Sequence, residues 1–512
     1  MTEESAQSAV LEFLGRPDGN ATPQRVDTHA AAVFLSRDRA LKIKRAVRFP
    51  FLDYSTLAKR KAACEAEIAV NRPYAPSIYR GVVAITRQRD GSLAVGGDGE
   101  PVEWAVEMGR FDETQTLDHL AAAGKVDAAL ADALGRAVAQ AHDKARAVKD
   151  LGFADVLGEI AAQNETELNG TPDLFSPASV ASLAEATRDA LAAVRPLLIA
   201  REHDGLVRRC HGDLHLGNIV LIDGKPVLFD AIEFDDRIAT ADVLYDLAFL
   251  LMDLIDRGLG HLATIVLNRY LADTRRDADL DALEALPLFM SVRAAIRAKV
   301  TAARLAQHAD DKGAAQSARD YHALAIRLLA PRAPVLVAVG GLSGTGKSLL
   351  ARALAAELPA APGAVWLRSD VERKALFGVT ETDRLPEAAY TREATARVYA
   401  RLAEKARRVL KAGHAVLVDA VFAAAPERAA IAQAAGGAPF HGLFLVADLA
   451  VRVARVGARA NDASDANAAV ARAQEDYDLG VMDWQPVDAS GTPAATLQAA
   501  LAALKRAPQA MR

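Results

Sequence analysis

Residues 211–218 read His-Gly-Asp-Leu-His-Leu-Gly-Asn, and this stretch decides the fold of the first half of the chain. It places Asp213 five residues before Asn218. Twelve residues after Asn218, the apolar run 227–234 carries a second carboxylate, Asp230. Transfer of a phosphoryl group needs a carboxylate that accepts a proton and further oxygen ligands that hold Mg²⁺. The pattern therefore predicts a phosphotransfer loop followed by a strand that ends at a metal-binding aspartate.

The motif and the strand after it resemble the aminoglycoside phosphotransferase and choline kinase-like families, over about residues 30–330. The resemblance implies an α+β protein-kinase-like domain with two lobes, a small sheet lobe and a larger helical lobe. The role of His215, which is also part of the motif, stays open. The residues that the resemblance assigns are the catalytic base Asp213, the Mg²⁺ ligands Asn218 and Asp230, the loop support His211 and the structural aspartate Asp246.

Two lysines near the N-terminus are candidates for binding the phosphates of ATP. Residues 40–44, Ala-Leu-Lys-Ile-Lys, alternate, so Lys42 and Lys44 face the same side of a strand. We expect one of them to contact the α/β-phosphates and to pair with a glutamate of the following helix, Glu67 or Glu65. Lys42 is preferred, because the small side chain of Ala40 leaves room for the nucleotide base. Two solvated lysines on an edge strand are the alternative.

The segments around these lysines predict the sheet lobe. After Phe111 the pattern becomes mostly helical, apart from residues 208–233. Met108, at the end of the last expected strand, is predicted to be the hinge residue beside the adenine. No Gly-x-Gly-x-x-Gly motif precedes the lysines. The expected elements are strands at 31–34, 40–44, 81–86 and 102–108 and a helix at 56–71.

A domain boundary is expected near residue 330. Residues 285–330 are rich in Ala, Leu and Arg and predict helices, and Pro331 and Pro334 end that pattern. The apolar run 335–341, Val-Leu-Val-Ala-Val-Gly-Gly, then predicts a buried strand of a parallel sheet. We therefore expect one domain at 1–330 and an α/β P-loop NTPase domain with a parallel sheet at 334–512.

A P-loop follows that strand directly. Residues 341–348 read Gly-Leu-Ser-Gly-Thr-Gly-Lys-Ser and match G-x-x-x-x-G-K-[ST]. The glycines let backbone N–H groups turn towards phosphates, the lysine reaches the β/γ-phosphates, and the final hydroxyl ligates Mg²⁺. The predicted nucleotide-binding residues are Gly341, Ser343, Gly344, Thr345, Gly346, Lys347 and Ser348, of which Ser348 is also the expected metal ligand and Lys347 the catalytic cation.

Two later apolar runs, 364–370 and 415–422, predict strands that end in Asp370 and Asp419. Asp419 is a Walker-B-like candidate for organising the metal. Over about 334–480 the sequence resembles the gluconate kinase, zeta toxin and polynucleotide kinase-like group of AAA-type P-loop kinases. The resemblance implies that Asp370 is the base on the acceptor side and that Arg373 is an acceptor-binding cation.

The remaining candidate residues are four arginines with two interpretations each, one aspartate and one tryptophan. Arg452, Arg455 and Arg459 recur at helical spacing and form either a cationic lid over the transferred phosphoryl group or a solvated helix face. Asp465 is expected to cap or order the next helix. Arg293 is expected on an exposed helix face, with an anionic acceptor as the alternative. Trp484 is expected to pack in the core.

Composition limits the function classes. Lys and Arg number 61 against 66 Asp and Glu, a net charge of −5, which argues against duplex nucleic acid as a partner. Cys64 and Cys210 are too few for a disulfide scaffold or a cysteine zinc cluster. We find no signal peptide and no apolar run long enough to span a membrane, so we expect a cytoplasmic protein.

These patterns together predict a bifunctional enzyme that uses ATP and Mg²⁺. Each domain would transfer the γ-phosphoryl group to a hydroxyl of a small-molecule acceptor. In one alternative, one domain is a nucleotide-binding regulatory or ATPase module that controls the other. In a second alternative, the P-loop domain acts on a polynucleotide 5′-end. The sequence identifies neither acceptor, since fold resemblance does not transfer substrate, and it does not indicate an oligomeric state.

Overall fold

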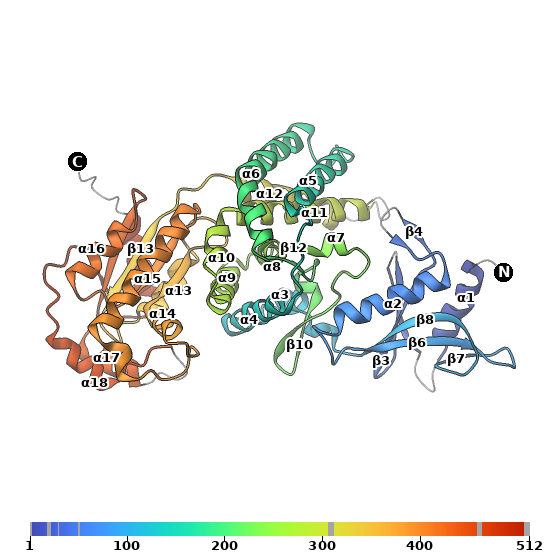
Figure 1. Cartoon of the computed structure of the whole chain (residues 1–512), viewed down its shortest axis with the longest axis horizontal. Coiled ribbons are helices and arrows are strands. Elements are labelled where there is room, and N and C mark those ends of the chain that lie inside the picture. The colour runs from blue at the N-terminus through green and yellow to red at the C-terminus, as the bar shows by residue number, and fades with distance from the viewer. Residues whose placement is uncertain are drawn as a thin grey trace. The chain divides into compact units, whose positions relative to one another are not determined.

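The computed structural model describes residues 3–17, 22–28, 30–49, 52–305, 312–457 and 463–505 (Figure 1). Contacts divide the chain into two compact units. Unit 1 comprises Met1–Leu157 and Leu198–Leu250, and unit 2 comprises Gly158–Leu197 and Leu251–Arg512. The division lies within the helical part of the predicted first domain, so that part contributes to both units. The domain boundaries at 330 and 334 stay a prediction.

Unit 1 contains an antiparallel six-stranded sheet, which includes all four strands expected from the sequence. A further strand, β7 (Leu93–Val95), lies between two of the expected strands. A short hairpin of β4 (Arg48–Phe49) and β5 (Leu52–Asp53) precedes the first long helix. The sheet strands in spatial order are β1 (Gln24–Asp27), β2 (Ala31–Leu35), β3 (Arg39–Lys44), β8 (Glu100–Gly109), β6 (Tyr79–Arg87) and β7 (Leu93–Val95).

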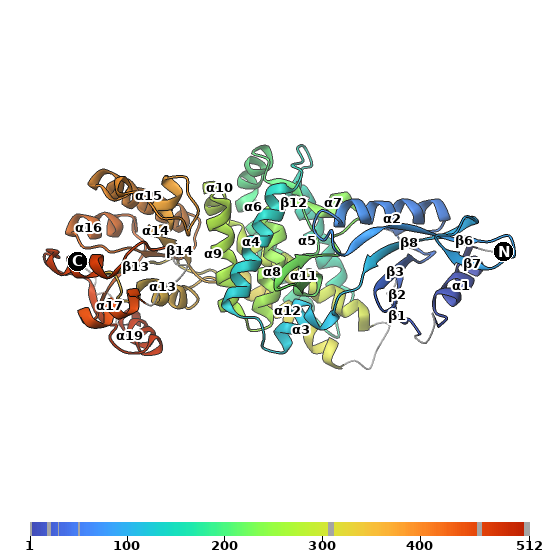
Figure 2. The ribbon, with the colours of Figure 1, turned by 90° about the horizontal axis from the view of Figure 1, so that it is seen from below.

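Helices cover both faces of this sheet (Figure 2). Helix α1 (Glu3–Leu14) packs on the face that carries Leu41 and Ile43. Helix α2 (Leu57–Asn71) lies on the opposite face, against β8 and β6. The Thr56 side chain caps α2 by accepting a hydrogen bond from a backbone N–H of its first turn. Strand alternation therefore directs the lysines of β3 towards α2, as expected.

The rest of unit 1 consists of helices and two small antiparallel sheets, β9–β12 and β10–β11. In the β10–β11 pair, Ile219 lies opposite Leu228. This register places Asn218, just before β10, next to Phe229, just after β11. Helices α5 (Phe153–Asn169), α6 (Pro177–His203) and α8 (Val243–Asp256) contribute residues to both units. The other elements are α3 (Leu117–Ala122), α4 (Ala128–Lys144), β9 (Val207–Arg209), β10 (Ile219–Ile222), β11 (Lys225–Leu228), α7 (Asp236–Ala239) and β12 (Thr240–Asp242).

Helices precede the P-loop domain in unit 2, and the sequence predicted those over residues 285–330. Arg293 of α11 is buried, so its expected place on an exposed helix face is wrong: its position on α11 lies among the apolar residues of the helix. Arg297, one turn later, lies over the ring of Tyr321 at 5.5 Å. The helices are α9 (Gly260–Thr274), α10 (Asp277–Asp281), α11 (Leu286–Leu305) and α12 (Lys312–Leu329).

The P-loop domain is a five-stranded parallel sheet in the order β14-β15-β13-β16-β17. Helices α13 and α19 pack on one face and α14, α15 and α16 on the other (Figure 2). This confirms the expected P-loop fold. The elements are β13 (Leu336–Gly341), α13 (Lys347–Ala355), β14 (Val365–Arg368), α14 (Ser369–Leu376), α15 (Arg392–Lys411), β15 (Val416–Asp419), α16 (Ala425–Gln433), β16 (Phe440–Val446), α17 (Leu449–Gly457), α18 (Ala468–Ala473), β17 (Gln485–Asp488) and α19 (Pro493–Lys505).

A helix that spans a membrane must be both long and apolar. None of the helices in the described ranges combines sufficient length with sufficient apolar character to cross a bilayer. Trp484 is buried and makes edge-on ring contacts with Phe422 and Phe440, which confirms its expected packing role.

Candidate active sites

Both lysines of β3 are paired with carboxylates in unit 1. Lys42 Nζ lies 2.9 Å from Glu67 Oε1 and 2.8 Å from Asp230 Oδ1. Lys44 Nζ lies 2.5 Å from Glu67 Oε2 and also pairs with Glu233. One glutamate of α2 therefore bridges both lysines, and the alternative of two solvated lysines is wrong.

Glu65, the other candidate, is exposed and lies 3.7 Å from Lys61 on the outer side of α2. The helix period explains the choice, because residues two apart on a helix point in different directions. Glu67 faces the strand and is fully buried, whereas Glu65 faces solvent. The sequence could not separate the two, because it did not define which face of α2 packs on the sheet.

The four side chains Lys42, Glu67, Lys44 and Glu233 alternate in charge. Burial alone would raise the pKa of Glu67, but the two lysines hold it below its ordinary value. Burial likewise opposes the charge of the lysines, yet the neighbouring carboxylates raise the pKa of both. Glu67, Lys42 and Lys44 are therefore charged at neutral pH, and each lysine compensates the glutamate between them.

The motif 211–218 forms a closed loop in which its polar groups bind one another. Asn218 Nδ2 donates to both Asp213 Oδ2 and the Asp213 carbonyl, each at 2.9 Å. Phe229 N donates to the Asn218 carbonyl at 3.0 Å, and His211 Nε2 donates to the Phe229 carbonyl at 2.9 Å. The loop thus holds Phe229 from both sides and places Asp230 at its edge.

Asp246 and His215 set the geometry of this loop. The buried Asp246 carboxylate accepts from Gly212 N at 2.8 Å, from His211 N at 3.3 Å and from His142 Nε2 at 3.1 Å. His215 Nδ1 accepts from the backbone N–H two residues later. Its other ring nitrogen then carries the proton and lies 3.5 Å from Asp213 Oδ2. The structure thus places His215 beside the Asp213 carboxylate, while its role stays open.

Asp230 lies two residues after the end of β11 and not at its last residue, a correction to the expected strand end. Its backbone is left-handed, with φ of 59°, and its N–H donates to the Tyr79 hydroxyl at 3.1 Å. Asn71 holds the next residue, Ala231, through hydrogen bonds to both its N–H and its carbonyl. A strained conformation held by such contacts is typical of a functional residue.

The donor set at this loop fits a hard divalent cation. Asp230 offers a carboxylate that is 45% exposed. Asn218 uses its Nδ2 on Asp213, which leaves Oδ1 as the atom that would ligate a metal. Carboxylate and amide oxygens are the ligands that Mg²⁺ prefers. Met108 lies next to last in β8, beside Ala40 of β3, where a hinge residue is expected, and its contact with adenine stays a prediction.

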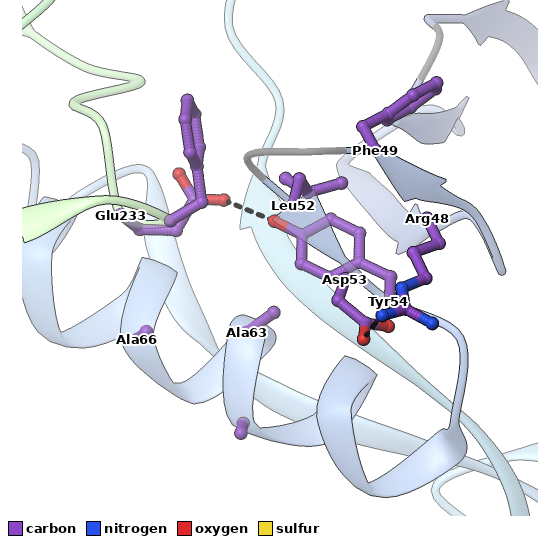
Figure 3. A pocket seen from close by; sticks show the side chains of 10 residues that line it. Arg48, Phe49, Leu52, Asp53, Tyr54, Ala63, Ala66 and Glu233 are labelled. Carbon is purple, nitrogen blue, oxygen red and sulfur yellow. Dashed lines mark hydrogen bonds and ion pairs between the residues drawn. The ribbon is translucent and has the colours of Figure 1, made fainter. Parts of the chain in front are cut away.

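A separate cleft of about 540 Å³ adjoins the Lys44–Glu233 pair. Its walls are the β4–β5 hairpin, three alanines of α2, Glu233 and Phe234 (Figure 3). The Tyr54 hydroxyl lies 3.4 Å from Glu233 Oε1 at its inner end. Lys42 and Asp230 do not line it, so this cleft is distinct from the site that those residues form.

In unit 2 the P-loop joins β13 to α13 as expected. Gly344 has φ of +88°, and a Cβ there would lie 2.4 Å from the Arg452 carbonyl oxygen. Only glycine fits such a position without displacing the backbone. Lys347 Nζ lies 3.3 Å from the Leu342 carbonyl, so the lysine folds back over the loop.

Side chains from later segments hold the P-loop backbone. Gln474 Oε1 accepts from Ser343 N at 2.6 Å, and Arg452 Nε donates to the Ser343 carbonyl at 3.0 Å. Arg455 Nη1 donates to the Thr345 carbonyl at 3.4 Å. No local motif marks Gln474, which lies 131 residues from Ser343.

Arg452 is buried and also pairs with Glu475, so both readings given for it, a lid and a solvated face, are wrong. Its guanidinium is directed inwards because α17 packs against the P-loop. Nucleotide contact by Arg455 and Arg459 stays a prediction, and Arg459 lies outside the described residues.

One carboxylate of this site ends strand β15, and the other lies in the helix that follows the neighbouring strand β14. Asp419 is the last residue of β15 and is buried, which raises its pKa, while Lys347 and a hydrogen bond with Ser348 oppose that rise. The Asp370 carboxylate raises it further. Asp370 lies in the first turn of α14, because β14 ends at Arg368, and the expected strand end is thereby corrected. The Ser348 hydroxyl and the Asp419 carboxylate suit Mg²⁺.

Arg373 and Asp465 both contact Tyr390. Arg373 Nη1 donates to the Ala389 carbonyl at 2.5 Å, and its guanidinium lies 5.0 Å from the Tyr390 ring centre. Asp465 accepts from the Tyr390 hydroxyl at 2.6 Å. Asn467, not Asp465, caps α18, so the expected cap is wrong. Acceptor binding by Arg373 stays a prediction.

Two known family profiles match the chain, one in each half. The profile described as "Phosphotransferase enzyme family" matches residues 44–286, and the profile described as "AAA domain" matches 336–477. Uncharacterized protein Rv2004c of Mycobacterium tuberculosis and Uncharacterized protein Mb2027c of Mycobacterium bovis are each 33% identical over 471 residues, with 89% of this chain and 90% of the relative covered.

The chain belongs to their family. It is an ATP-dependent kinase with a kinase-like N-terminal region and a P-loop kinase domain at its C-terminus. This confirms the two resemblances stated from the motifs. ATP with a divalent metal is the cofactor set of such kinases.

Solved structures similar to this family member include two enzymes. A choline/ethanolamine kinase family protein from Mesorhizobium loti is 15% identical, covers 64% of this chain and 95% of its own, and has a TM-score of 0.41. A gluconokinase from Sinorhizobium meliloti 1021 is 22% identical, covers 34% and 94%, and has a TM-score of 0.26. Likenesses at these TM-scores carry no weight for activity or substrate.

Proposed function

We propose that the chain is a bifunctional phosphotransferase in which each site transfers the γ-phosphoryl group of ATP to a hydroxyl of a small-molecule acceptor. The observation that carries the proposal is the contact of Lys42 with both Glu67 and Asp230, beside the Asp213–Asn218 loop. Mg²⁺ would screen the charge of the phosphates at each site. The proposal includes the cytoplasmic location expected from the sequence.

At the first site, Asp213 accepts the proton of the acceptor hydroxyl. Asn218 and His215 contact its carboxylate from two directions and so orient that carboxylate. Asn218 and Asp230 are the proposed Mg²⁺ ligands. Lys42 then moves its charge from Asp230 to the phosphates, while Glu67 stays paired with Lys44. The second lysine thus keeps the buried glutamate neutralised during this exchange.

At the second site, backbone N–H groups of 341–348 and Lys347 bind the phosphates. Ser348 and Asp419 hold Mg²⁺, and Asp370 accepts the acceptor proton. Asp370 and Asp419 are close enough for the first to raise the pKa of the second, in support of a shared site. The pairing of a base with a metal carboxylate favours transfer to an acceptor over simple hydrolysis.

The transfer of label from [γ-³²P]ATP into a metabolite extract tests the proposal. We expect one set of labelled products to disappear in Asp213→Asn and another in Lys347→Ala, with all label transfer lost in the double variant. The exposed residues Asp223 and Lys411 provide matched controls, Asp223→Asn and Lys411→Ala, which should keep both sets.

Other outcomes decide between the alternatives. If Asp213→Asn abolishes every product, including those that depend on Lys347, one domain regulates the other and two independent transfers are excluded. Label that depends on Lys347 and enters only an added 5′-hydroxyl oligonucleotide would identify a polynucleotide kinase. Release of phosphate from ATP with no labelled product in any arm would contradict the proposal.

A further inference from the structure

Strand β14 is an edge strand of the P-loop sheet, and helix α9 covers its open side. The Asn268 side chain of α9 donates from Nδ2 to the Ala364 carbonyl at 3.1 Å and accepts through Oδ1 from Trp366 N at 2.6 Å. These are the hydrogen bonds that one residue of a neighbouring parallel strand would make. One turn earlier, Thr264 donates to the Pro362 carbonyl. A helix from the predicted first domain therefore completes the edge of this sheet.

A second contact ties α9 to the end of the same strand. Arg269 Nη1 lies 2.5 Å from Glu381 Oε2, and Arg368 Nη1 lies 3.2 Å from Glu381 Oε1. The three side chains are 14%, 21% and 14% exposed, so water screens them weakly. Lys374 of α14 donates to the Glu381 carbonyl at 2.8 Å. Glu381 thus links α9 to both the strand and the helix that flank Asp370.

A third set of contacts joins α10 to α15 without touching β14. Arg401 Nη2 lies 2.6 Å from Asp277 Oδ1, and Arg408 Nη1 lies 2.8 Å from Asp281 Oδ2. These pairs strengthen the packing of the same helical segment against the P-loop domain. Arg401 also lies 3.5 Å from Glu372 of α14, so the Arg408–Asp281 pair is the one whose loss leaves α14 alone.

We propose that α9 is a working part of the P-loop site, in which Arg269, through Glu381, and Asn268 position β14 and with it Asp370. The inference rests on the proposed role of Asp370 as acceptor-side base. Asp370 follows Arg368 by two residues, so a shift of the strand end moves the base directly. Displacement of a catalytic group by about 1 Å can lower turnover by about a hundredfold. Arg269, Asn268 and Glu381 are positioning residues, since they act through the strand.

The test uses the full chain in an Asp213→Asn background, which silences the first site. Variants Arg269→Gln, Glu381→Gln, their double and the control Arg408→Gln are compared. Hydrogen exchange is followed in peptides that cover 364–381. We expect faster exchange there in the first three variants and exchange like the wild type in Arg408→Gln.

The second readout is the rate at which the Lys347-dependent labelled product forms, measured as a function of ATP concentration. Turnover should fall about tenfold in Arg269→Gln and in Glu381→Gln, while the KM for ATP changes less than about twofold. The double variant should match Glu381→Gln, because that single variant already removes the contact of Arg269 with Glu381 together with that of Arg368. A purely structural role would lower the amount of folded enzyme and would not separate turnover from the KM.

The possible results distinguish a failure of the positioning role from a failure of the proposed function. If no product depends on Lys347 in the Asp213→Asn background itself, the proposed function fails, and hydrogen exchange still decides the positioning. Exchange and turnover in Arg269→Gln equal to those of Arg408→Gln would overturn the inference. Additive losses in the double variant would also overturn it, since the two residues would then act separately.

Discussion

Replacing Lys44 by methionine tests how far the buried ion pairs stabilise the sheet lobe. Methionine keeps much of the length of lysine but removes its charge. Glu67 would retain Lys42, 2.9 Å away, whereas Glu233 would face the Tyr54 hydroxyl at 3.4 Å. The variant therefore leaves Glu233 as the undercompensated charge.

The expected magnitude follows from burial. The side chains of Lys44, Glu67 and Glu233 are 3%, 0% and 7% exposed. Loss of one partner of a buried ion pair costs about 3–5 kcal/mol, because the remaining charge stays desolvated. Lys42 still compensates Glu67, so we expect the lower end, about 3 kcal/mol. At about 1.4 kcal/mol per factor of ten, local opening should become more than about a hundredfold more frequent.

Hydrogen exchange of peptides from β3 and α2 in the full chain measures this opening directly. Lys61→Met is the matched control, since Lys61 is exposed and lies 3.7 Å from Glu65. It should change the free energy of opening by less than about 0.5 kcal/mol. Lys44→Met combined with Glu233→Leu should recover part of the loss, because that buried charge is gone.

Two results would refute this reasoning. In the first, Lys44→Met exchanges as slowly as Lys61→Met, which would mean that the buried pairs contribute no stability. In the second, the loss in the double variant equals the sum of the losses of Lys44→Met and Glu233→Leu, which would mean that the two side chains do not interact.

Three further predictions concern single contacts. Gly344→Ala should abolish nucleotide binding at the P-loop, because its Cβ would lie 2.4 Å from the Arg452 carbonyl, and calorimetric titration of the chain should then find one ATP site instead of two. Gln474→Ala removes the acceptor of Ser343 N and should weaken ATP binding there about tenfold, while Gln474→Glu should not. Burial lowers the pKa of His211 below 6.5, so urea unfolding should show stability falling as pH drops below about 6.5, less steeply in His211→Asn.

Each of these predictions has a contrary result. Two ATP sites of unchanged affinity in Gly344→Ala would show that the loop can move away from α17. Equal affinity of the alanine and glutamate variants of Gln474 would remove its role in holding the P-loop. For His211 the sign is fixed, since the unfolded chain takes up the proton first. The same pH slope in His211→Asn would assign the acid sensitivity to other groups.

Motifs with fixed spacing predicted several contacts that the structure shows, while the catalytic and binding roles of these residues stay predictions. The distance from Asp213 to Asn218 is short and local, so the sequence alone defined that contact, and the P-loop likewise carries its geometry in consecutive residues. Lys42 and Lys44 were placed correctly on one face by strand alternation. Contacts between residues that are close in the sequence could therefore be predicted from the sequence.

Contacts between distant segments could not be predicted in the same way. Gln474 binds the P-loop across 131 residues, and Asn268 binds β14 across 98, and neither stands in a recognisable motif. Boundaries failed for a related reason. Whether Asp465 or Asn467 caps α18 depends on where that helix begins, and both residue types are good caps.

The cover that α9 gives to β14 has a consequence for how this chain can be divided by evolution or by cloning. A gene cut between Pro331 and Pro334 would yield a C-terminal fragment whose edge strand β14 offers unsatisfied N–H and C=O groups to any other strand. Such a fragment would tend to self-associate through that edge. Within the part of the chain that the structure describes, the helix that covers this edge lies upstream of the cut, so the fusion of the two kinase domains also protects the edge strand.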